Sequence, residues 1–343
     1  MGVHPTPRQI AKGLLNGILP PRPLFLPIVF SLGAKVGNVP LANFRENATK
    51  ISNSLRQMQS HLRLDGVSCY FDPHLEQEAL GAKVERGEEL EPAFVHWPRP
   101  IQPGGMPEGL CSPDETAQRG RVPVATEVIR RMNALPNRDF LLMAGVSGPM
   151  TLAIRITQRE GDEKLRFEDV PTSVQDYAAS VVTRTASAFL EAGSDLIIIQ
   201  EQILPAFSAQ SCEAWANLLA PTINVIRFYE ALPVLRLSPM RCVLQNWDTI
   251  AQQHWDCVVA LPLEALASRE AAGFPPTNDV MIGISLLWET FGPERSDGDE
   301  ILPILKPVVS RLRPALLTTS GDVPAMTEMK RLVKILGEVP RAF

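Results

Sequence analysis

The chain alternates between short apolar segments and longer amphipathic segments along most of its length. Eight apolar segments have the length and composition of β-strands, and helical three- and four-residue spacing fills nearly every interval between them. These segments are Leu24–Phe30, Gly66–Phe71, Phe140–Gly145, Asp195–Gln200, Pro233–Leu237, Asp256–Leu261, Val280–Ser285 and Pro314–Thr319. Strands that are apolar on both faces belong to a parallel sheet covered by helices. Eight such units favour a closed (β/α)8 TIM barrel, with an open doubly wound sheet as the alternative.

The length of the chain fits one barrel domain. Its 343 residues lie within the range of α/β barrels, so we predict a single domain over residues 1–343. The expected helices cover residues 5–17, 44–63, 124–135, 148–158, 172–193, 209–230, 240–255, 263–271, 299–312 and 324–337. Residues 84–122 are polar, rich in proline and glycine and weakly periodic. They predict a long irregular insertion with room for a hairpin.

Charge and composition exclude several classes of protein. The net charge of -5 lacks the basic footprint of a nucleic-acid binder. The apolar runs are too short to span a membrane, and the first residues do not resemble a secretory signal. Five cysteines, an odd number without CxxC spacing, favour a cytoplasmic protein without a disulfide framework. No phosphate-binding glycine motif follows a strand, which argues against a nucleotide-binding sheet.

Polar residues follow several of the predicted strands. In a (β/α)8 barrel the chemistry lies at the C-terminal ends of the strands, so these residues are the candidates for the site. They are Asp72, His74, Ser147, Gln200, Glu201, Gln202, Trp288, Glu289 and Asp322.

Most of these residues also have a structural explanation. Asp72 precedes a proline and has the sequence of a helix N-cap. Ser147 is either an ordinary N-cap or part of a helix start whose N–H groups hold an anion. Asp322 has the position of a cap for the last helix, and His74 that of a surface histidine. Glu201 follows four apolar residues between two glutamines, which favours a place in the pocket over solvent.

Four segments resemble one known family. Tyr70–Val84 resembles the "D-x-x-x-E-A-E-A-L-G-A" stretch of the uroporphyrinogen decarboxylase superfamily, and Gly145–Leu152 is similar to its "G-x-x-G-P-F/M-T-L" segment. Leu317–Pro324 and Pro21–Gly37 are similar to its last and first motifs. The likeness is greater to the corrinoid-dependent methyltransferase branch. The resemblance implies a (β/α)8 barrel with its site at the strand C-termini, and it matches Asp72 to an essential aspartate.

The chain departs from the family at its binding groups. Uroporphyrinogen decarboxylases carry a pair of arginines after the first strand, where this chain reads Phe30-Ser31-Leu32-Gly33-Ala34-Lys35. The family's catalytic tyrosine falls near Arg155. The methyltransferase branch binds zinc through His-x-Cys after the fifth strand and Cys after the eighth. At the first place this chain has Leu237-Ser238-Pro239 or, in an alternative register, Gln245-Asn246-Trp247, and at the second it has Gly321. The standard zinc site is therefore not expected, although a rearranged site using His74, Glu201 or Cys257 stays open.

Three functions remain open. The first is methyl transfer or demethylation of a small molecule, linked to a corrinoid or folate, with Asp72 and Glu201 donating protons or orienting the substrate. The second is a cofactor-free decarboxylase or lyase in which Arg155 holds a carboxylate and Asp72 protonates the carbanion. The third is a non-catalytic small-molecule binding protein. The resemblance also implies a corrinoid protein as partner and a homodimer.

Overall fold

All eight predicted strands are present in the computed structural model. It describes residues 5–85, 94–97, 108–238, 246–270, 280–287, 301–325, 327–328 and 332–334. The strands are β1 Leu24–Leu26, β2 Gly66–Tyr70, β5 Leu141–Ser147, β6 Leu196–Glu201, β7 Leu232–Leu237, β8 Val258–Pro262, β9 Met281–Leu286 and β10 Leu316–Thr319. Nearly every residue in them is buried, as expected for strands with apolar residues on both faces.

The strands form a nearly closed barrel. They are hydrogen-bonded in the order β1-β10-β9-β8-β7-β6-β5-β2, and every neighbouring pair is parallel. The two strands at the ends of this order, β1 and β2, contact each other. The predicted (β/α)8 fold is therefore confirmed, and the open sheet was the wrong alternative.

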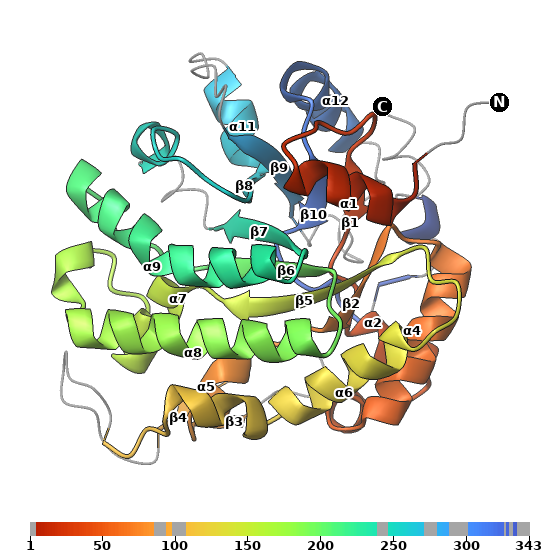
Figure 1. Ribbon diagram of the computed structural model, residues 1–343, viewed down its shortest axis with the longest axis horizontal. Coiled ribbons are helices and arrows are strands. Elements are labelled where there is room, and N and C mark those ends of the chain that lie inside the picture. The colour runs from red at the N-terminus through yellow and green to blue at the C-terminus, as the bar shows by residue number, and fades with distance from the viewer. Residues whose placement is uncertain are drawn as a thin grey trace.

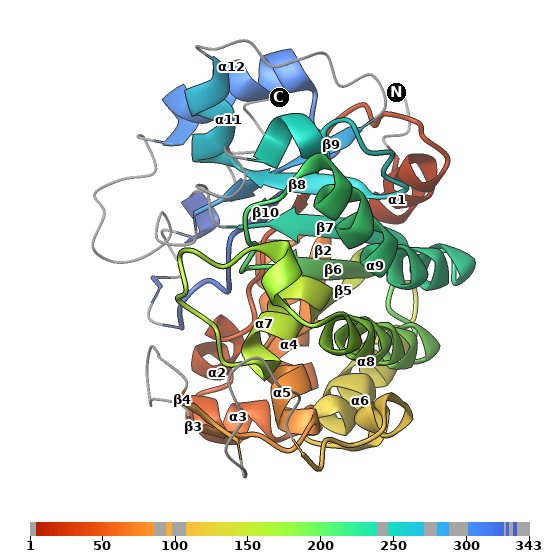
Figure 2. The ribbon, with the colours of Figure 1, turned by 90° about the vertical axis from the view of Figure 1, so that its left-hand side faces the viewer.

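Helices surround the barrel on its outer side (Figure 1). The described helices are α1 Pro7–Leu15, α2 Leu32–Val36, α3 Leu41–Arg45, α4 Ala48–Leu62, α5 Leu75–Ala79, α6 Val122–Asn133, α7 Pro149–Ile156, α8 Thr172–Glu191, α9 Ala209–Phe228, α11 Leu263–Glu270 and α12 Ile301–Leu312, with 3-10 turns η1 Pro113–Gln118 and η2 Phe167–Asp169. In the view of Figure 2, α8 and α9 lie side by side outside β5 and β6. Within the described residues, no helix combines the length and apolarity that a bilayer crossing requires. The helices expected at 240–255 and 324–337 lie partly outside the described residues.

The predicted insertion contains a two-stranded antiparallel sheet. β3 Lys83–Glu85 pairs with β4 Phe94–His96, which agrees with the hairpin that the sequence allowed in this insertion. The C-terminal part of the insertion is attached to the barrel, because the Tyr177 hydroxyl on α8 donates to the Cys111 carbonyl at 2.6 Å. Residues 86–93 and 98–107 of the insertion lie outside the described residues.

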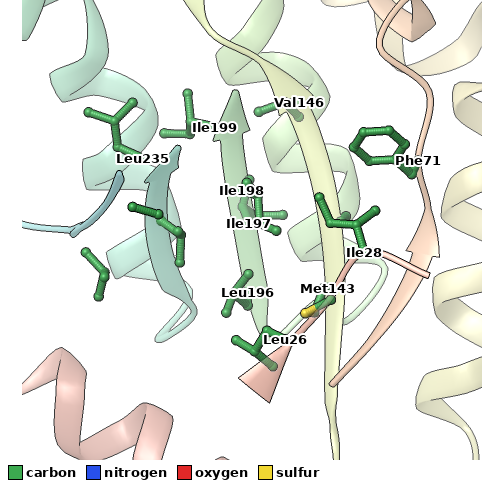
Figure 3. Close-up of a cluster of buried hydrophobic side chains, with 14 of the residues drawn as sticks. Leu26, Ile28, Phe71, Met143, Val146, Leu196, Ile197, Ile198, Ile199 and Leu235 are labelled. Atoms are coloured by element: carbon green, nitrogen blue, oxygen red, sulfur yellow. The ribbon is translucent and has the colours of Figure 1, made fainter. Parts of the chain in front are cut away.

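Large apolar side chains fill the centre of the barrel. Figure 3 shows Leu26, Ile28 and Met143 close together between the strands. Gly66 makes room for them, because a Cβ at this position would lie 2.7 Å from the Leu26 Cδ2 and 3.0 Å from the Met143 Sδ. A side chain there would displace the interior residues of β1 and β5. The interior is therefore a packed core, as in other barrels of this kind.

An aspartate ties the two end strands together at the N-terminal end of the barrel. The Asp65 carboxylate, just before β2, accepts the Phe25 N–H of β1 at 2.8 Å. It also accepts two hydrogen bonds from the Arg22 guanidinium, at 2.6 and 2.8 Å. Bidentate pairs of this kind are stronger and more directional than single ones. They join β1 to β2, where a strand ladder is not formed.

The same arrangement recurs before β6. The Asp195 carboxylate accepts the Leu142 N–H of β5 at 2.8 Å and pairs with the guanidinium of Arg138. In both cases the arginine precedes the neighbouring strand by a few residues. These contacts lie at the N-terminal ends of the strands, the end that in such barrels serves stability rather than catalysis.

The first strand is shorter than predicted. The apolar run continues to Phe30, but β1 ends at Leu26. Beyond it, the Ile28 N–H donates to the Thr319 Oγ1 at 2.9 Å, and the Phe30 and Ser31 N–H groups donate to the Asp322 carboxylate at 2.7 and 2.9 Å. Because side chains take these backbone donors, the segment leaves the ladder and turns into α2.

Candidate functional site

Most predicted site residues that the structure describes lie at the C-terminal end of the barrel or in the turns that follow the strands, whereas Arg155 lies in helix α7. Along β6 the side chains alternate between the two sides of the sheet, as strand geometry requires. Gln200 points inward, since a Cβ on Gly145 would lie 2.5 Å from its Nε2. Glu201 points outward and contacts the helices α7 and α9. Neighbouring predicted residues therefore have different surroundings.

The Glu201 carboxylate binds the N-terminus of α7. It accepts the Met150 and Thr151 N–H groups at 3.1 and 2.8 Å, and the Thr151 hydroxyl at 2.7 Å. It also accepts the indole N–H of Trp215 on α9 at 3.0 Å. A helix start is a favourable place for a carboxylate. Glu201 is fully buried and has four donors, so this geometry describes a side chain that holds β6, α7 and α9 together.

The sequence left two alternatives at the start of α7, a Ser147 N-cap or a helix start that holds an anion, and the structure shows a carboxylate of the protein at this place. Ser147 is not the N-cap, because that position belongs to Gly148. The Ser147 N–H and hydroxyl instead donate to the buried Glu76 carboxylate on α5, at 3.0 and 2.9 Å. Burial raises the pKa of Glu76, and likewise that of Glu201. The α7 N-terminus is thus occupied by a carboxylate of this chain.

Asp72 forms a buried ion pair that the sequence did not reveal. Its Oδ2 accepts from the Arg121 guanidinium at 2.9 Å, and its Oδ1 accepts the His74 N–H at 2.9 Å. Arg121 also binds the Glu78 carboxylate at 2.5 Å. The cap of α5 is His74, so Asp72 shapes the turn before the helix rather than capping it. Arg121 lies at the end of the long insertion, and the ion pair attaches that insertion to the barrel mouth.

A second group of predicted residues meets around the turn at Pro73. The Arg155 guanidinium donates to the Pro73 carbonyl at 2.5 Å and to the Gln202 Oε1 at 2.6 Å. The Nδ1 of His74 contacts the Gln77 Oε1 at 2.6 Å. Because an amide oxygen only accepts, Nδ1 carries the proton and Nε2 keeps its lone pair. The pKa of His74 is lowered by burial first and by Arg155 next, which favours the neutral imidazole.

These contacts create one cluster of five predicted residues, which we call the Pro73 cluster. Its members are Asp72, His74, Ser147, Arg155 and Gln202. Burial lowers the pKa of Arg155, which nevertheless remains the cationic member. Since His74 is partly exposed, the cluster presents a neutral acceptor beside a buried cation. Such a pair can bind a polar substrate group or accept a proton.

Asp322 binds the turn after β1, and the last helix that it was predicted to cap lies largely outside the described residues. Its two oxygens accept the Phe30 and Ser31 N–H groups. Burial raises the pKa of this carboxyl to about 6. Asp322 therefore links the end of β10 to the start of α2, on the side of the barrel where β1 lies between β10 and β2.

Arg236 is a candidate site residue that does not lie at a predicted strand end. It lies within β7, has no exposed surface, and is the register partner of Gln200. Its guanidinium donates to the Gln200 Oε1 and to the Ser320 carbonyl, which follows β10. Because β7 and β10 are separated by two strands, the side chain reaches across the interior of the barrel. The signal in the sequence was an arginine inside the apolar segment Leu232–Leu237.

The residues at the usual zinc position do not fit a zinc ion. The fifth and eighth barrel strands, β7 and β10, are the places where the resemblance expects His-x-Cys and Cys. A guanidinium joins these two places here, and it is cationic with only donor groups. Across the part of the chain that the structure describes, no three His, Cys, Asp or Glu side chains group as metal ligands. Cys242 and the residues around it lie outside that part.

The rearranged metal site is wrong as far as it uses Cys257. This cysteine precedes β8, at the N-terminal end of the barrel, whereas His74 and Glu201 lie at C-terminal ends. A strand of five or six residues separates the two ends by ~16–20 Å. Burial also raises the pKa of the Cys257 thiol to about 12. Trp288 and Glu289, the remaining predicted site residues, lie outside the described residues.

Comparison with known proteins gives one family and several relatives. Residues 26–223, more than half of the chain, match the model of the uroporphyrinogen decarboxylase (URO-D) family. The chain is 26% identical over 129 residues to the methylcobamide:CoM methyltransferase MtaA of Methanosarcina barkeri (strain Fusaro / DSM 804). That alignment spans 37% of each protein, so it covers little more than a third of the relative's length.

Solved structures share the fold over the whole chain. A methyltransferase from Methanosarcina mazei superposes with a TM-score of 0.74 at 18% identity, and the match covers 98% of both chains. A putative vitamin-B12-independent methionine synthase from Listeria monocytogenes has a TM-score of 0.51 at 14% identity, over 94% of this chain and 97% of that one. At these identities the likeness concerns the fold, and it agrees with the barrel described above.

The contacts of Glu201 predict a structural effect of its substitution. Glu201→Gln replaces one acceptor oxygen by an NH₂ group that faces buried donors, and each donor left unsatisfied costs about 1–3 kcal/mol. We expect the free energy of unfolding, measured by urea denaturation, to fall by about 2–4 kcal/mol. Glu213→Gln, an exposed position on α9, is the control and should change it by less than about 0.5 kcal/mol. A Glu201→Gln protein as stable as the control, but inactive, would instead favour the proton-donor role.

Asp322 predicts a pH dependence of stability. Its pKa is 3.8 in the unfolded chain and about 6 in the folded protein. Between these values the folded state binds the proton more tightly, so the free energy of unfolding falls as the pH rises from about 4 to about 6, by up to about 3 kcal/mol. Urea denaturation of wild type and Asp322→Asn across this range should show a smaller fall in the variant, by up to about 3 kcal/mol, because Glu76 and Glu201, whose pKa values are also raised, titrate in both proteins. Parallel curves for the two proteins would contradict the assignment.

Proposed function

Since the chain belongs to the uroporphyrinogen decarboxylase family, we propose that it is an enzyme that transfers a methyl group between a small molecule and a corrinoid or folate carrier. The similarity to methylcobamide:CoM methyltransferases supports methyl transfer, although it covers only part of the chain. The buried polar groups at the C-terminal end of the barrel support a site of the kind that barrel enzymes have.

The contacts of the turn after β1 are the main observation that favours methyl transfer over decarboxylation of a tetrapyrrole. Uroporphyrinogen decarboxylases are expected to grip substrate carboxylates there with two arginines. In this chain the turn is bound by the Asp322 carboxylate through the Phe30 and Ser31 N–H groups. A carboxylate at this place repels the carboxylates of such a substrate rather than binding them.

The contacts of Asp72 support the same choice. A decarboxylase needs a protonated acid to deliver a proton to the carbanion. The Asp72 carboxylate is paired with Arg121 at 2.9 Å and accepts the His74 N–H as well. Its proposed role is therefore to orient the turn that carries His74, and through it the substrate.

The acceptor or donor of the methyl group is proposed to be a small molecule other than a thiol. Zinc activates a thiol by stabilising the thiolate, and the described residues do not fit zinc. The Pro73 cluster supplies instead the neutral imidazole of His74 and the cation of Arg155. In the proposal these residues bind the substrate together with Gln202, while Gln200 lines the site through its contact with Arg236. Trp288 and Glu289 remain predicted members of the site.

The proposal places the enzyme in the cytoplasm. The four described cysteines are buried and unpaired, as expected for a reducing compartment. A corrinoid protein as methyl carrier and a homodimer remain predictions from the family resemblance.

A labelling experiment tests the proposed transfer. Purified protein is incubated without oxygen with ¹³C-methylcobalamin or with ¹³C-methyltetrahydrofolate and a small-molecule cell extract, and labelled products are identified by mass spectrometry. We expect a protein-dependent methylated product from at least one donor. Added coenzyme M should not be methylated faster than in protein-free controls. Asp72→Ala should lower the rate about 10- to 100-fold, because it releases the turn that positions His74.

The controls separate the three functions. Glu213→Gln is the matched variant and should keep the wild-type rate, since its side chain is exposed on α9. Protein-dependent release of carbon dioxide without label transfer would favour the lyase. Absence of both, with an extract component that binds tightly, would favour the binding protein and contradict the proposal.

A further inference from the structure

Arg236 places a positive charge inside the barrel, below the polar residues of the strand ends. Its side chain has no exposed surface. One end of the guanidinium binds the side-chain carbonyl of Gln200, and the other binds the backbone carbonyl of Ser320. The charge therefore lies between β6, β7 and the segment after β10.

The charge has no counter-charge in the part of the chain that the structure describes. Both acceptors are neutral carbonyl oxygens, and the Nε of Arg236 has no hydrogen-bond partner. Burial lowers the pKa of Arg236 to about 10, with no carboxylate acting in the opposite direction. At neutral pH the group is still cationic. A buried cation without an anion is strongly unfavourable for stability, which points to a role beyond folding.

The residues around this charge are small or lack partners of their own. Arg236 is in register with Ala260 on β8, and Ala260 with Gly283 on β9. Two residues beyond Gly283, on the same side of the sheet, the Ser285 hydroxyl is buried and has no hydrogen-bond partner in the described residues. Gly145 leaves room for the Gln200 amide. This end of the interior therefore combines an unpaired cation with an unpaired hydroxyl, while the Leu316 side chain fills the space beside Gly283 and the Gln200 amide fills the space beside Gly145.

We propose that Arg236 binds a carboxylate group of the substrate, as a fixed cation at the place where the methyltransferase branch is expected to hold zinc. The proposal rests on the proposed function, because it names the chemical class of the small molecule: a carboxylic acid. Arg236 is then a substrate-binding residue, and the carboxylate supplies the missing counter-charge.

The carboxylate reaches the guanidinium by replacing the amide of Gln200. Hydrogen bonds between ions are about twice as strong as those between neutral groups, so a carboxylate displaces the neutral Gln200 carbonyl. The Gln200 side chain can rotate away, whereas the Ser320 carbonyl is part of the backbone. The Nε and an NH₂ group together form the planar fork that matches a carboxylate. The Gln200 amide therefore acts as a stand-in for the substrate.

The test uses formate, the smallest carboxylate, so that the result does not depend on the shape of the substrate. The thermal midpoint of the full-length protein is measured against increasing sodium formate, with sodium chloride at equal ionic strength and formamide as controls. We expect a saturable rise with formate alone. Arg236→Met, which has similar length and no charge, should lose this rise. Gln200→Ala, which removes the competing acceptor, should reach half of the rise at a lower formate concentration.

The same variants separate binding from a structural bridge. If Arg236 binds substrate, Arg236→Met without formate should have a thermal midpoint no lower than that of the wild type, because the unpaired charge is gone. A strongly lowered midpoint together with an unchanged formate response would overturn the proposal. So would any result in which wild type and Arg236→Met respond equally to formate, including no response in either.

This measurement does not depend on turnover. A protein that binds formate through Arg236 but labels no product would keep the present inference and contradict the proposed methyl transfer. If the protein transfers methyl groups but its Arg236→Met variant binds formate as well as the wild type, the proposed methyl transfer stands and the present inference is contradicted.

Discussion

In the function proposed for this barrel, the choice of substrate depends on one buried guanidinium. Arg236 spans the interior from β7 to the segment after β10, and its two observed acceptors are uncharged. A fixed cation in this place acts on substrates differently from zinc: it attracts and orients an anion, but it does not turn a thiol into a thiolate. The proposed carboxylate substrate, the proposed acceptor other than a thiol and the proposed displacement of Gln200 all follow from this group.

Carboxylates of the chain stabilise the barrel that surrounds Arg236. Asp65 and Asp195 bind backbone N–H groups at the N-terminal ends of strands, while Glu201 and Asp322 bind them at the C-terminal end. In each case a backbone N–H group without a partner in the strand ladder or helix donates to a carboxylate. A hydrogen bond to a charged acceptor is stronger than one to a neutral acceptor. Acidic residues near the site therefore serve largely to position it. The Pro73 cluster and Arg236 remain as the groups proposed to bind a ligand.

The fold could be predicted because each strand is marked by a local run of apolar residues. The site could not, because it depends on the directions in which side chains point in the folded protein. Eight apolar runs identify the strands, and their ends differ from the prediction by at most four residues, at β1, where Asp322 removes backbone donors from the ladder. The sequence shows Gln200 and Glu201 side by side, but strand alternation sends one inward to Arg236 and the other outward to α7. The pairing of Asp72 with Arg121 joins positions 49 residues apart and left no pattern. Arg236 did leave one, a charge inside an apolar strand.

The metal content of the purified protein tests the central claim most directly. If a guanidinium has taken the place of zinc, elemental analysis after gel filtration in zinc-supplemented buffer should find far less than one zinc per chain. Arg236→Met should not change this result, because it removes the cation without adding a ligand. One tightly held zinc per chain in the wild type would contradict the account and restore a thiol as the natural methyl acceptor.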